Sequence, residues 1–499
     1  MRTTTSNQPS GSESPEEHRF GSGLIGDLLW LAVGYGGRTL AFFGVTVLLT
    51  RSLGAEGYGT LSLFMAYALG LSYLCGSWPF LAVPVLAASE HDVGAAFRPA
   101  AAVAGWAGAL GLLVLVPLAW ATLTKDFLAL AALAVFSLML IGLQGVYGFL
   151  QAEGRMRGIA VVQTGERTIA LVALGLLAAL TSLTIVSAEV TLALAATAAC
   201  FLAFGSIVRR RPIFGAVGGE RGPTIRTAMG TVGPMAMVTV CAYVVAWIDI
   251  FVIAVFRTHS DVGVYSLAQQ ILMFLIQLGS LWITATLPRH AKSTSAGLSF
   301  EEQLPIPQLR ASSQAWAGAV GLAAVPLVLL IPKVFGEEFR ASSVPLMLLL
   351  CGATLFAPYI ATVSAMIGSG RTRLLAWTSL GAAALNLTLD IALVPAIGIV
   401  GAGIATLVQG TFNSVLIVWL ARGPTALWVV GKRVLPVAIL TGVAAVDPYS
   451  PPLLAALGIV SAVALLAGGR ELHASMFGTR GQIGDESIEP LIDAAGGGL

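Results

Sequence analysis

Ionisable side chains lie within long apolar segments at five positions: Arg38, Glu166, Arg167, Asp249 and Asp390. A charge at membrane depth costs about 2.5–3.5 kcal/mol on insertion scales, so such groups usually face a cavity and mark a substrate or ion path. The two arginines suit an anion, because the guanidinium group offers a planar fork of donors that matches phosphate oxygens. Arg167 has a second interpretation, since it lies near enough to the end of its segment to snorkel or to pair with an acid. We expect Glu166 to balance local charge rather than to bind a ligand.

The second half of the chain carries only acids in its apolar segments, and neutral oxygen ligands accompany them. Asn386 and Asp390 are four residues apart, so they share one helix face. The next apolar segment carries Thr406, with Ala402 one turn before it on the same face. Together with Asp249, these residues offer carboxylates, an amide, a hydroxyl and a backbone carbonyl, a hard-oxygen set suited to a small cation. The alternative for Asn386 and Thr406 is hydrogen bonding between helices.

The elements that carry these residues are predicted to be membrane-spanning helices, since 57% of the 499 residues are hydrophobic and 10% are charged. Fourteen apolar runs can cross about 30 Å of hydrocarbon, and they do not alternate as barrel strands do. They start near residues 24, 60, 97, 127, 159, 188, 228, 263, 313, 342, 374, 400, 433 and 452. The predicted fold class is an all-α integral membrane protein with about fourteen transmembrane helices.

Other sequence signals argue against several classes of function. No Walker A sequence appears, and no Ser/His/Asp or HExxH arrangement lies at a plausible aqueous site. The four cysteines lie singly in apolar segments, so we expect neither a disulfide framework nor a cysteine metal site. The triple arginine at 209–211 is better interpreted as a topology anchor at a membrane edge than as a nucleic-acid contact.

Positive charge sets the predicted orientation. With the N-terminus in the cytoplasm, twenty of the 27 Lys and Arg residues fall in cytoplasmic tails and loops, five fall in outer loops, and Arg38 and Arg167 remain inside spans. This bias predicts that both termini are cytoplasmic and that the number of helices is even.

Two short patterns recur at similar offsets. Arg51 to Gly57 matches Arg257 to Gly263, and the run at 154–157 (GRMR) matches the run at 370–373 (GRTR). Such repeats predict two six-helix lobes related by an axis along the membrane normal, a plan typical of transporters. The predicted organisation is a disordered cytoplasmic tail (1–23), a first lobe (24–208), a basic cytoplasmic linker (209–227), a second lobe (228–421), two further helices (422–468) and a cytoplasmic tail (469–499).

Longer motifs resemble those of a known family. "LLTRSLGAEGYGTLSLFMAY", "DVGVYSLAQQI", "LPRHA", "FGEEFRASSVPLMLLL", "SAMIGSGRTR" and "LVPAIGIVGAGIATLVQG" occur in order over roughly residues 24–425. The chain resembles the bacterial polysaccharide (oligosaccharide repeat-unit) flippases of the multidrug/oligosaccharidyl-lipid/polysaccharide exporter superfamily. The resemblance implies two lobes around a central cavity, alternating access, and a lipid-diphosphate-linked glycan carried from the inner to the outer leaflet.

A sister family, the lipid II flippases, also has fourteen helices and binds sodium in its second lobe. This resemblance assigns the sodium ligands to Asp249, Asn386, Asp390, Ala402 and Thr406, the set that the chemistry also indicates. That family also places arginines around its cavity. The present chain matches one of them by helix only, at Arg38.

The run that starts near residue 263 departs from the lipid II pattern, because it carries glutamines in place of arginine. This argues against lipid II as the substrate. The predicted substrate-binding residues are therefore Arg38, Arg167, Gln269 and Gln277.

The sequence thus predicts a flippase for undecaprenyl-diphosphate-linked oligosaccharides in polysaccharide biosynthesis, and not an enzyme. We expect no cofactor beyond Na⁺ or H⁺ as the coupling ion. The expected partners are the lipid-linked glycan and membrane lipid, with polymerase or glycan-assembly proteins as further candidates and no nucleic acid. We expect a multi-pass monomer in the bacterial inner (plasma) membrane. The alternatives are a lipid II flippase, a multidrug/cation antiporter of the same superfamily and, more remotely, a membrane glycosyltransferase or ligase.

Overall fold

The computed structural model describes residues 15–80, 83, 93–208, 225–295 and 297–477. The regular structure in these ranges is helical, without a strand. The first helix starts at Pro15, within the predicted tail 1–23, and the last ends at Phe477, within the predicted tail 469–499. The remainder of both tails, most of the linker 209–227 and the triple arginine at 209–211 lie outside the described residues.

The first half of the chain forms one very long helix followed by four ordinary membrane-length helices. These elements are α1 (Pro15–Leu71), the π-helix η1 (Ser72–Ser77), α3 (Val93–Thr122), α4 (Phe127–Ala152), α5 (Met156–Leu180) and α6 (Ile185–Val208).

The second half has more elements, because one predicted span is broken and a short helix lies in a loop. These elements are α7 (Ile225–Phe256), α8 (His259–Ser295), α9 (Phe300–Gln303), α10 (Ile306–Val334), the 3₁₀ helix η2 (Glu337–Ser342), α11 (Ser343–Leu355), α12 (Ala357–Gly368), α13 (Thr372–Ile397), α14 (Ile399–Ala444) and α15 (Pro451–Phe477).

Two of the helices each contain two predicted spans, joined at a glycine. Gly54 in α1 has φ 67°, and Gly423 in α14 has φ 80°. Both values lie in the left-handed region, which glycine adopts without a steric penalty. The described residues contain eleven helical segments long and apolar enough to span a membrane. Dividing the two segments that contain these glycines and adding α8 gives fourteen crossings, as the sequence predicts. The thirteenth starts after Gly423, about ten residues before the predicted position.

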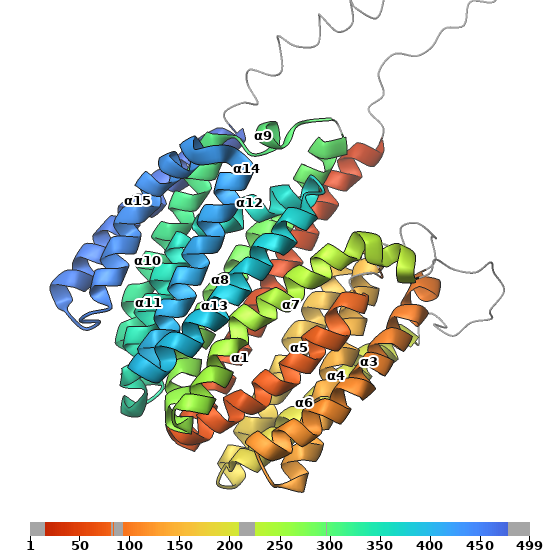
Figure 1. Cartoon of the computed structure of the whole chain (residues 1–499). Coiled ribbons are helices and arrows are strands. Elements are labelled where there is room, and N and C mark those ends of the chain that lie inside the picture. Colours follow the sequence, from red (N-terminus) through yellow and green to blue (C-terminus); the bar gives the residue numbers. More distant parts are fainter. Residues whose placement is uncertain (1–14, 81–82, 84–92, 209–224, 296, 478–499) are drawn as a thin grey trace, which may run out of the picture.

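The helices form two groups that meet along α1, α7 and α8 (Figure 1). In the first half α1 packs on α5, and α4 packs on α6. In the second half α10 packs on α15, α11 packs on α14, and α13 packs on both α7 and α14. The long contact between α1 and α8 joins the groups. The arrangement is the predicted pair of lobes with two C-terminal helices.

The two groups approach each other closely where the two repeated motifs cross. A Cβ atom on Gly59 would collide with the carbonyl oxygen of His259, and one on Gly263 would collide with that of Ala55. Only glycine permits such an approach of two backbones. Thr60 adds a hydrogen bond to Nδ1 of His259 at 2.9 Å. We call this end of the bundle the Arg51 end; it is the predicted outer face.

The two arginines that the repeat equates have the same role at this end. Nε of Arg51 donates to the carbonyl of Val334 at 2.9 Å, at the end of α10. Arg257 donates to the carbonyls of Val394, at 3.1 and 3.2 Å, and of Pro395, at 2.8 Å, near the end of α13. Helix C-termini leave carbonyl groups without intrahelical partners, and a guanidinium group satisfies them.

Candidate functional site: a cavity between the two groups of helices

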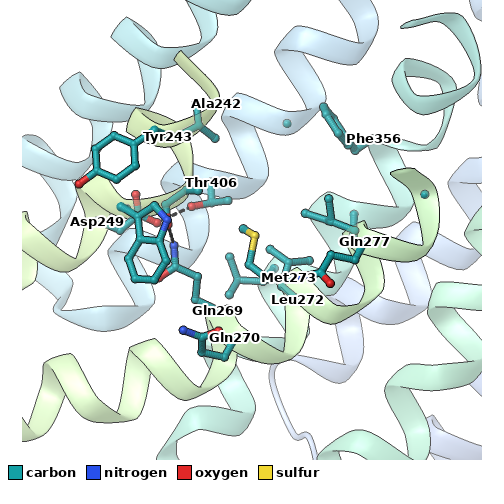
Figure 2. Close-up of a pocket in the computed structure, with 18 of the residues that line it drawn as sticks. Ala242, Tyr243, Asp249, Gln269, Gln270, Leu272, Met273, Gln277, Phe356 and Thr406 are labelled. Carbon is teal, nitrogen blue, oxygen red and sulfur yellow. Dashed lines mark hydrogen bonds between the residues drawn. The ribbon is translucent and has the colours of Figure 1, made fainter. Parts of the chain in front are cut away.

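A cavity of about 490 Å³ lies between the two groups of helices. Its lining comes from α1, η1, α4 and α5 in the first half and from α7, α8, α11, α12, α13 and α14 in the second. Three of the five predicted ionisable residues line the cavity: Arg38 and Arg167 from the first half and Asp249 from the second. Residues more than 200 positions apart in the sequence therefore share one cavity, part of which Figure 2 shows.

The first half contributes an arginine wall, which we define as Arg38 and Arg167. Arg38 is half-buried, whereas Arg167 is 8% exposed. Nε of Arg167 lies 3.5 Å from Oε1 of Glu166 but makes no hydrogen bond, and its guanidinium carbon lies 4.7 Å from the ring centre of Phe42. The stacking and the single acid only partly satisfy this cation. Arg167 is therefore buried at the cavity rather than snorkelling to a membrane edge, and its remaining donors are available to an anion.

The second half contributes a carboxylate cluster, which we define as Asp249, Asn386, Asp390 and Thr406. Nδ2 of Asn386 donates to Oδ1 of Asp249 at 2.7 Å and to Oδ2 of Asp390 at 3.0 Å. The hydroxyl of Thr406 donates to Oδ2 of Asp249 at 2.7 Å, the pair visible in Figure 2. The two carboxyl groups also lie within hydrogen-bonding reach of each other. Residues predicted from helix spacing on three separate helices thus meet at one point.

Tyr265 belongs to this cluster, although the sequence reasoning missed it. Its hydroxyl donates to Oδ2 of Asp249 and lies 3.4 Å from the hydroxyl of Thr406. A usable signal exists in the sequence, because Tyr265 is four residues before Gln269 and so shares its helix face. A tyrosine in an apolar run otherwise looks like any packed aromatic residue.

The predicted glutamines line the cavity along α8, as Figure 2 shows. Gln269 donates to the carbonyl of Ala246, and its own side-chain oxygen has no partner. Oε1 of Gln277 accepts a hydrogen bond from Thr39 at 3.5 Å, a contact between the two halves. Gln270 lies beside them and also faces the cavity.

Of the predicted cation set, Asp249 and Thr406 line the cavity, whereas Asn386 and Asp390 are buried behind them and Ala402 also lies away from the cavity surface. Ala402 is fully buried in the apolar core, one turn before Thr406 on α14. Its position is compatible with the role given to its carbonyl group, which depends on the backbone and not on the side chain.

The carboxylate cluster has the composition of a cation site. Its donors are an amide and hydroxyls, so the described hydrogen bonds bring no positive charge to the two carboxylates. Two buried oxygens, Oδ1 of Asn386 and Oδ1 of Asp390, have no hydrogen-bond partner. Buried oxygens without partners are costly unless a ligand satisfies them. The residues present therefore fit a hard cation such as Na⁺.

A model of one protein family, described as polysaccharide biosynthesis protein, matches residues 24–294. The chain belongs to this family. The matched range includes the arginine wall together with Asp249, Tyr265 and the glutamines of α8. No curated protein sequence is similar enough to count as a match.

Solved structures of membrane transporters share the fold. The lipid II flippase MurJ, in an inward closed conformation, matches with a TM-score of 0.63 at 14% identity, over 90% of this chain and 99% of that one. The multidrug transporter DinF-BH of the MATE family, solved as a complex, matches with a TM-score of 0.60 at 15% identity, over 83% of this chain and 98% of that one. An inward-facing MATE transporter of the MOP superfamily matches with a TM-score of 0.59 at 14% identity, over 79% and 95%. The protein is thus a multi-span membrane protein with the fold of flippases and multidrug transporters.

Proposed function

We propose that the protein moves an undecaprenyl-diphosphate-linked oligosaccharide from the inner to the outer leaflet of the bacterial plasma membrane, by alternating access coupled to an ion gradient. One observation carries the proposal: a single cavity is lined by two arginines from one half and, from the other half, by Asp249 and Thr406 of the carboxylate cluster. The family, whose printed description is polysaccharide biosynthesis, supports a glycan as the transported group.

In this proposal the arginine wall holds the diphosphate. Arg38 and Arg167 offer fork-shaped donors to phosphate oxygens, and an enclosed site strengthens that attraction relative to bulk water. The cavity of about 490 Å³ falls in the range of small-molecule sites, ~300–1,000 Å³. It therefore suits a head group with its first sugars, while the lipid tail remains in the membrane.

The carboxylate cluster couples transport to an ion. Two neighbouring buried carboxylates cannot both stay ionised cheaply, so they require a bound cation or a proton. The neutral ligands Asn386 and Thr406 favour sodium, because a proton needs no cage of oxygens. One charge that moves inward through 100 mV releases about 2.3 kcal/mol, enough to bias the return of the empty carrier.

The contacts at the Arg51 end indicate which access state the structure represents. Besides the crossing of Gly59 and Gly263, the backbone N–H of Ala55 donates to Oε2 of Glu338 at 3.2 Å, and Tyr58 packs edge-on against Phe339 with ring centres 6.0 Å apart. If this end faces outward, as the distribution of arginines and lysines predicts, the cavity is closed toward the outside. Transport then requires these contacts to open.

The decisive experiment is a deletion of the gene followed by analysis of lipid-linked intermediates. The proposal predicts that an undecaprenyl-diphosphate oligosaccharide accumulates on the inner leaflet and that the wild-type gene clears it. Accumulation of lipid II would instead identify a lipid II flippase. A strain without any trapped lipid-linked glycan would refute the proposal.

An exporter of organic cations is the second candidate, favoured by the acid Asp249 at the cavity surface and by the fold shared with the multidrug transporter DinF-BH. The arginine wall argues against it, because like charges in one enclosed space repel a cationic drug. Efflux of a cationic rhodamine dye from cells that express the protein, lost in Asp249→Asn, would favour this candidate over the flippase.

A further inference from the structure

The cavity contains a second polar group on the second half, which we call the neutral set: Tyr359, Ser379, Gln409 and Asn413. All four line the same cavity as the arginine wall and as Asp249 and Thr406 of the carboxylate cluster. Ser379, Gln409 and Asn413 are 6%, 4% and 4% exposed. None of the four carries a formal charge, so the set has no evident part in holding a diphosphate or a cation.

Helix spacing places three members of the neutral set, Ser379, Gln409 and Asn413, along the same helix faces as members of the carboxylate cluster. On α14, Thr406, Gln409 and Asn413 follow each other at intervals of three and four residues, and on α13 Ser379 lies seven residues before Asn386. Such intervals keep side chains on one face. Since α13 ends at the Arg51 end, Ser379 lies about 16 Å farther from that end than Asp390. The polar stripe therefore extends from the cation cluster toward the predicted cytoplasmic side.

The contacts within the neutral set leave part of its hydrogen-bonding capacity free. The hydroxyl of Tyr359 lies near Ser379 and Asn413, and no described hydrogen bond joins it to either side chain. Oδ1 of Asn413 is buried and has no partner. The ring of Tyr359 stacks on that of Phe356, with centroids 4.2 Å apart and an interplanar angle of 21°. The result is an aromatic pair beside an unsatisfied amide at a cavity wall.

Two simpler roles fit these observations less well. An ion route along the stripe is unnecessary, because Asp249 and Thr406 already line the cavity and an ion can reach them directly. If the set served only to hold helices together, its polar atoms would be paired in hydrogen bonds between helices, yet Oδ1 of Asn413 has no partner. A buried carbonyl oxygen without a partner costs free energy that a ligand donor can recover.

We propose that the neutral set is a sugar subsite that binds the hexose or N-acetylhexosamine joined to the diphosphate. The proposal rests on the proposed function and names the part of the substrate that this wall recognises. A sugar ring has apolar C–H faces that pack on aromatic rings, and its hydroxyl edge both donates and accepts hydrogen bonds. Amide and hydroxyl side chains match that edge without requiring charge. The arginine wall then binds the diphosphate, which is common to many lipid-linked glycans, and the neutral set recognises the sugar.

The test measures binding of the purified full-length protein in lipid nanodiscs to three short-chain polyprenyl probes. One carries a bare diphosphate, one a diphosphate with a single hexose, and one a diphosphate with a single N-acetylhexosamine. The quantity of interest is the ratio of Kd for the bare probe to Kd for the better sugar probe. We expect a ratio of about ten in the wild type, on the order of one or two hydrogen bonds.

Asn413→Leu and Ser379→Ala should each bring this ratio down to about one or two while leaving the Kd for the bare diphosphate unchanged. Gln314→Leu is the matched control. It also removes a buried amide whose oxygen has no partner, but it lies on α10 away from the cavity lining, so the ratio should stay near ten. Ser379→Ala is the milder change and keeps the test valid if Asn413→Leu fails to fold.

The outcomes separate the two proposals. A wild-type ratio near one, or a ratio that both variants retain, overturns the sugar subsite. Loss of the sugar increment in the variants together with normal bare-diphosphate binding supports it. If the bare probe binds equally well to wild type and Arg38→Ala, the diphosphate role of the arginine wall fails on its own. If no probe binds the wild type, both proposals fail.

Discussion

The arginine wall and the carboxylate cluster, the latter through Asp249 and Thr406, reach one cavity, but their polar groups are satisfied in opposite ways. In the second half, Asp249 accepts hydrogen bonds from Asn386, Thr406 and Tyr265. In the first half, Arg167 has one acid at 3.5 Å and leaves its Nε without a hydrogen bond. The cluster therefore holds its charged groups in a fixed geometry, whereas the wall keeps donors free.

This difference corresponds to two kinds of ligand. A small cation requires several oxygens at fixed short distances, so its ligands must be oriented beforehand. A diphosphate brings many acceptor oxygens and a flexible attachment, so a few long arginine side chains can adapt to it. The following predictions test that division of roles.

The largest effect is expected at Arg38, which faces the cavity without a described acidic partner. Arg38→Ala should lower glycolipid transport roughly 100-fold or more, about 2.7 kcal/mol, because it removes charge-assisted hydrogen bonds to the diphosphate. Arg38→Lys should recover only part, since lysine keeps the charge but loses the fork. The measurement is complementation of the deletion strain, normalised to the amount of protein in the membrane.

Arg340→Ala is the matched control for that experiment, because Arg340 is exposed near the Arg51 end and pairs with Glu337 at 3.6 Å. It should transport normally. Normal transport by Arg38→Ala would show that the wall does not hold the diphosphate. Disappearance of the protein from the membrane would show that Arg38 is structural.

The next effect concerns the carboxylates. Asp249→Asn and Asp390→Asn should each abolish the rise in melting temperature that sodium produces in the purified wild-type protein, since ligand binding to the folded state stabilises it. Sodium is varied against potassium at constant ionic strength. A wild-type protein whose melting temperature ignores sodium, with transport that follows pH alone, would make the cluster a proton site.

Much of this comparison could be predicted from the sequence. Hydropathy predicts the number of membrane crossings, because each apolar run is long enough, as a helix, to span the hydrocarbon layer of the membrane. The sequence predicts Asn386 and Asp390 as site residues, because an acid inside an apolar helix is rare and the four-residue spacing places both side chains on one face. The repeat that relates Arg51 to Arg257 is detectable in the sequence. The structure shows that both side chains donate hydrogen bonds to carbonyl groups near helix ends.

Other features could not be predicted, because they depend on how helices meet. At the crossing of Gly59 and Gly263 two helix backbones come together. The sequence shows that each helix contains a glycine there, but it does not show which helix packs against that glycine. From the sequence alone, Ser379 and Asn413 are equally consistent with hydrogen bonding between packed helices. Only the position of the cavity shows that their side chains line it. The continuity of α1 through Gly54 is not predictable either, because the polar and glycine-containing stretch after Arg51 is typical of a loop.

A smaller effect is expected from the hydroxyl groups of the cluster. Thr406→Val keeps the shape of the side chain but removes the donor to Asp249, so sodium affinity should fall about five- to tenfold, roughly one hydrogen bond. Tyr265→Phe should weaken sodium binding less, because it removes a donor that orients Asp249 rather than a predicted ion ligand. Sodium titrations of the melting temperature give both values. Equal losses in the two variants would place Tyr265 among the ligands themselves.

The smallest effect, and one of opposite sign, is expected at Glu166. Glu166→Gln removes the acid that lies 3.5 Å from Arg167, so the arginine wall gains net positive charge. Binding of the bare polyprenyl diphosphate should therefore tighten about threefold, within the ~1 kcal/mol typical of a partly screened ion pair. The melting temperature should fall slightly, since Arg167 is then buried without a counter-charge.

Glu337→Gln, which removes an exposed acid paired with Arg340, should change neither quantity. Removing an acid thus strengthens ligand binding in the first half and weakens it in the second. Weaker diphosphate binding in Glu166→Gln would mean that Glu166 fixes the position of Arg167 more than it competes for its charge.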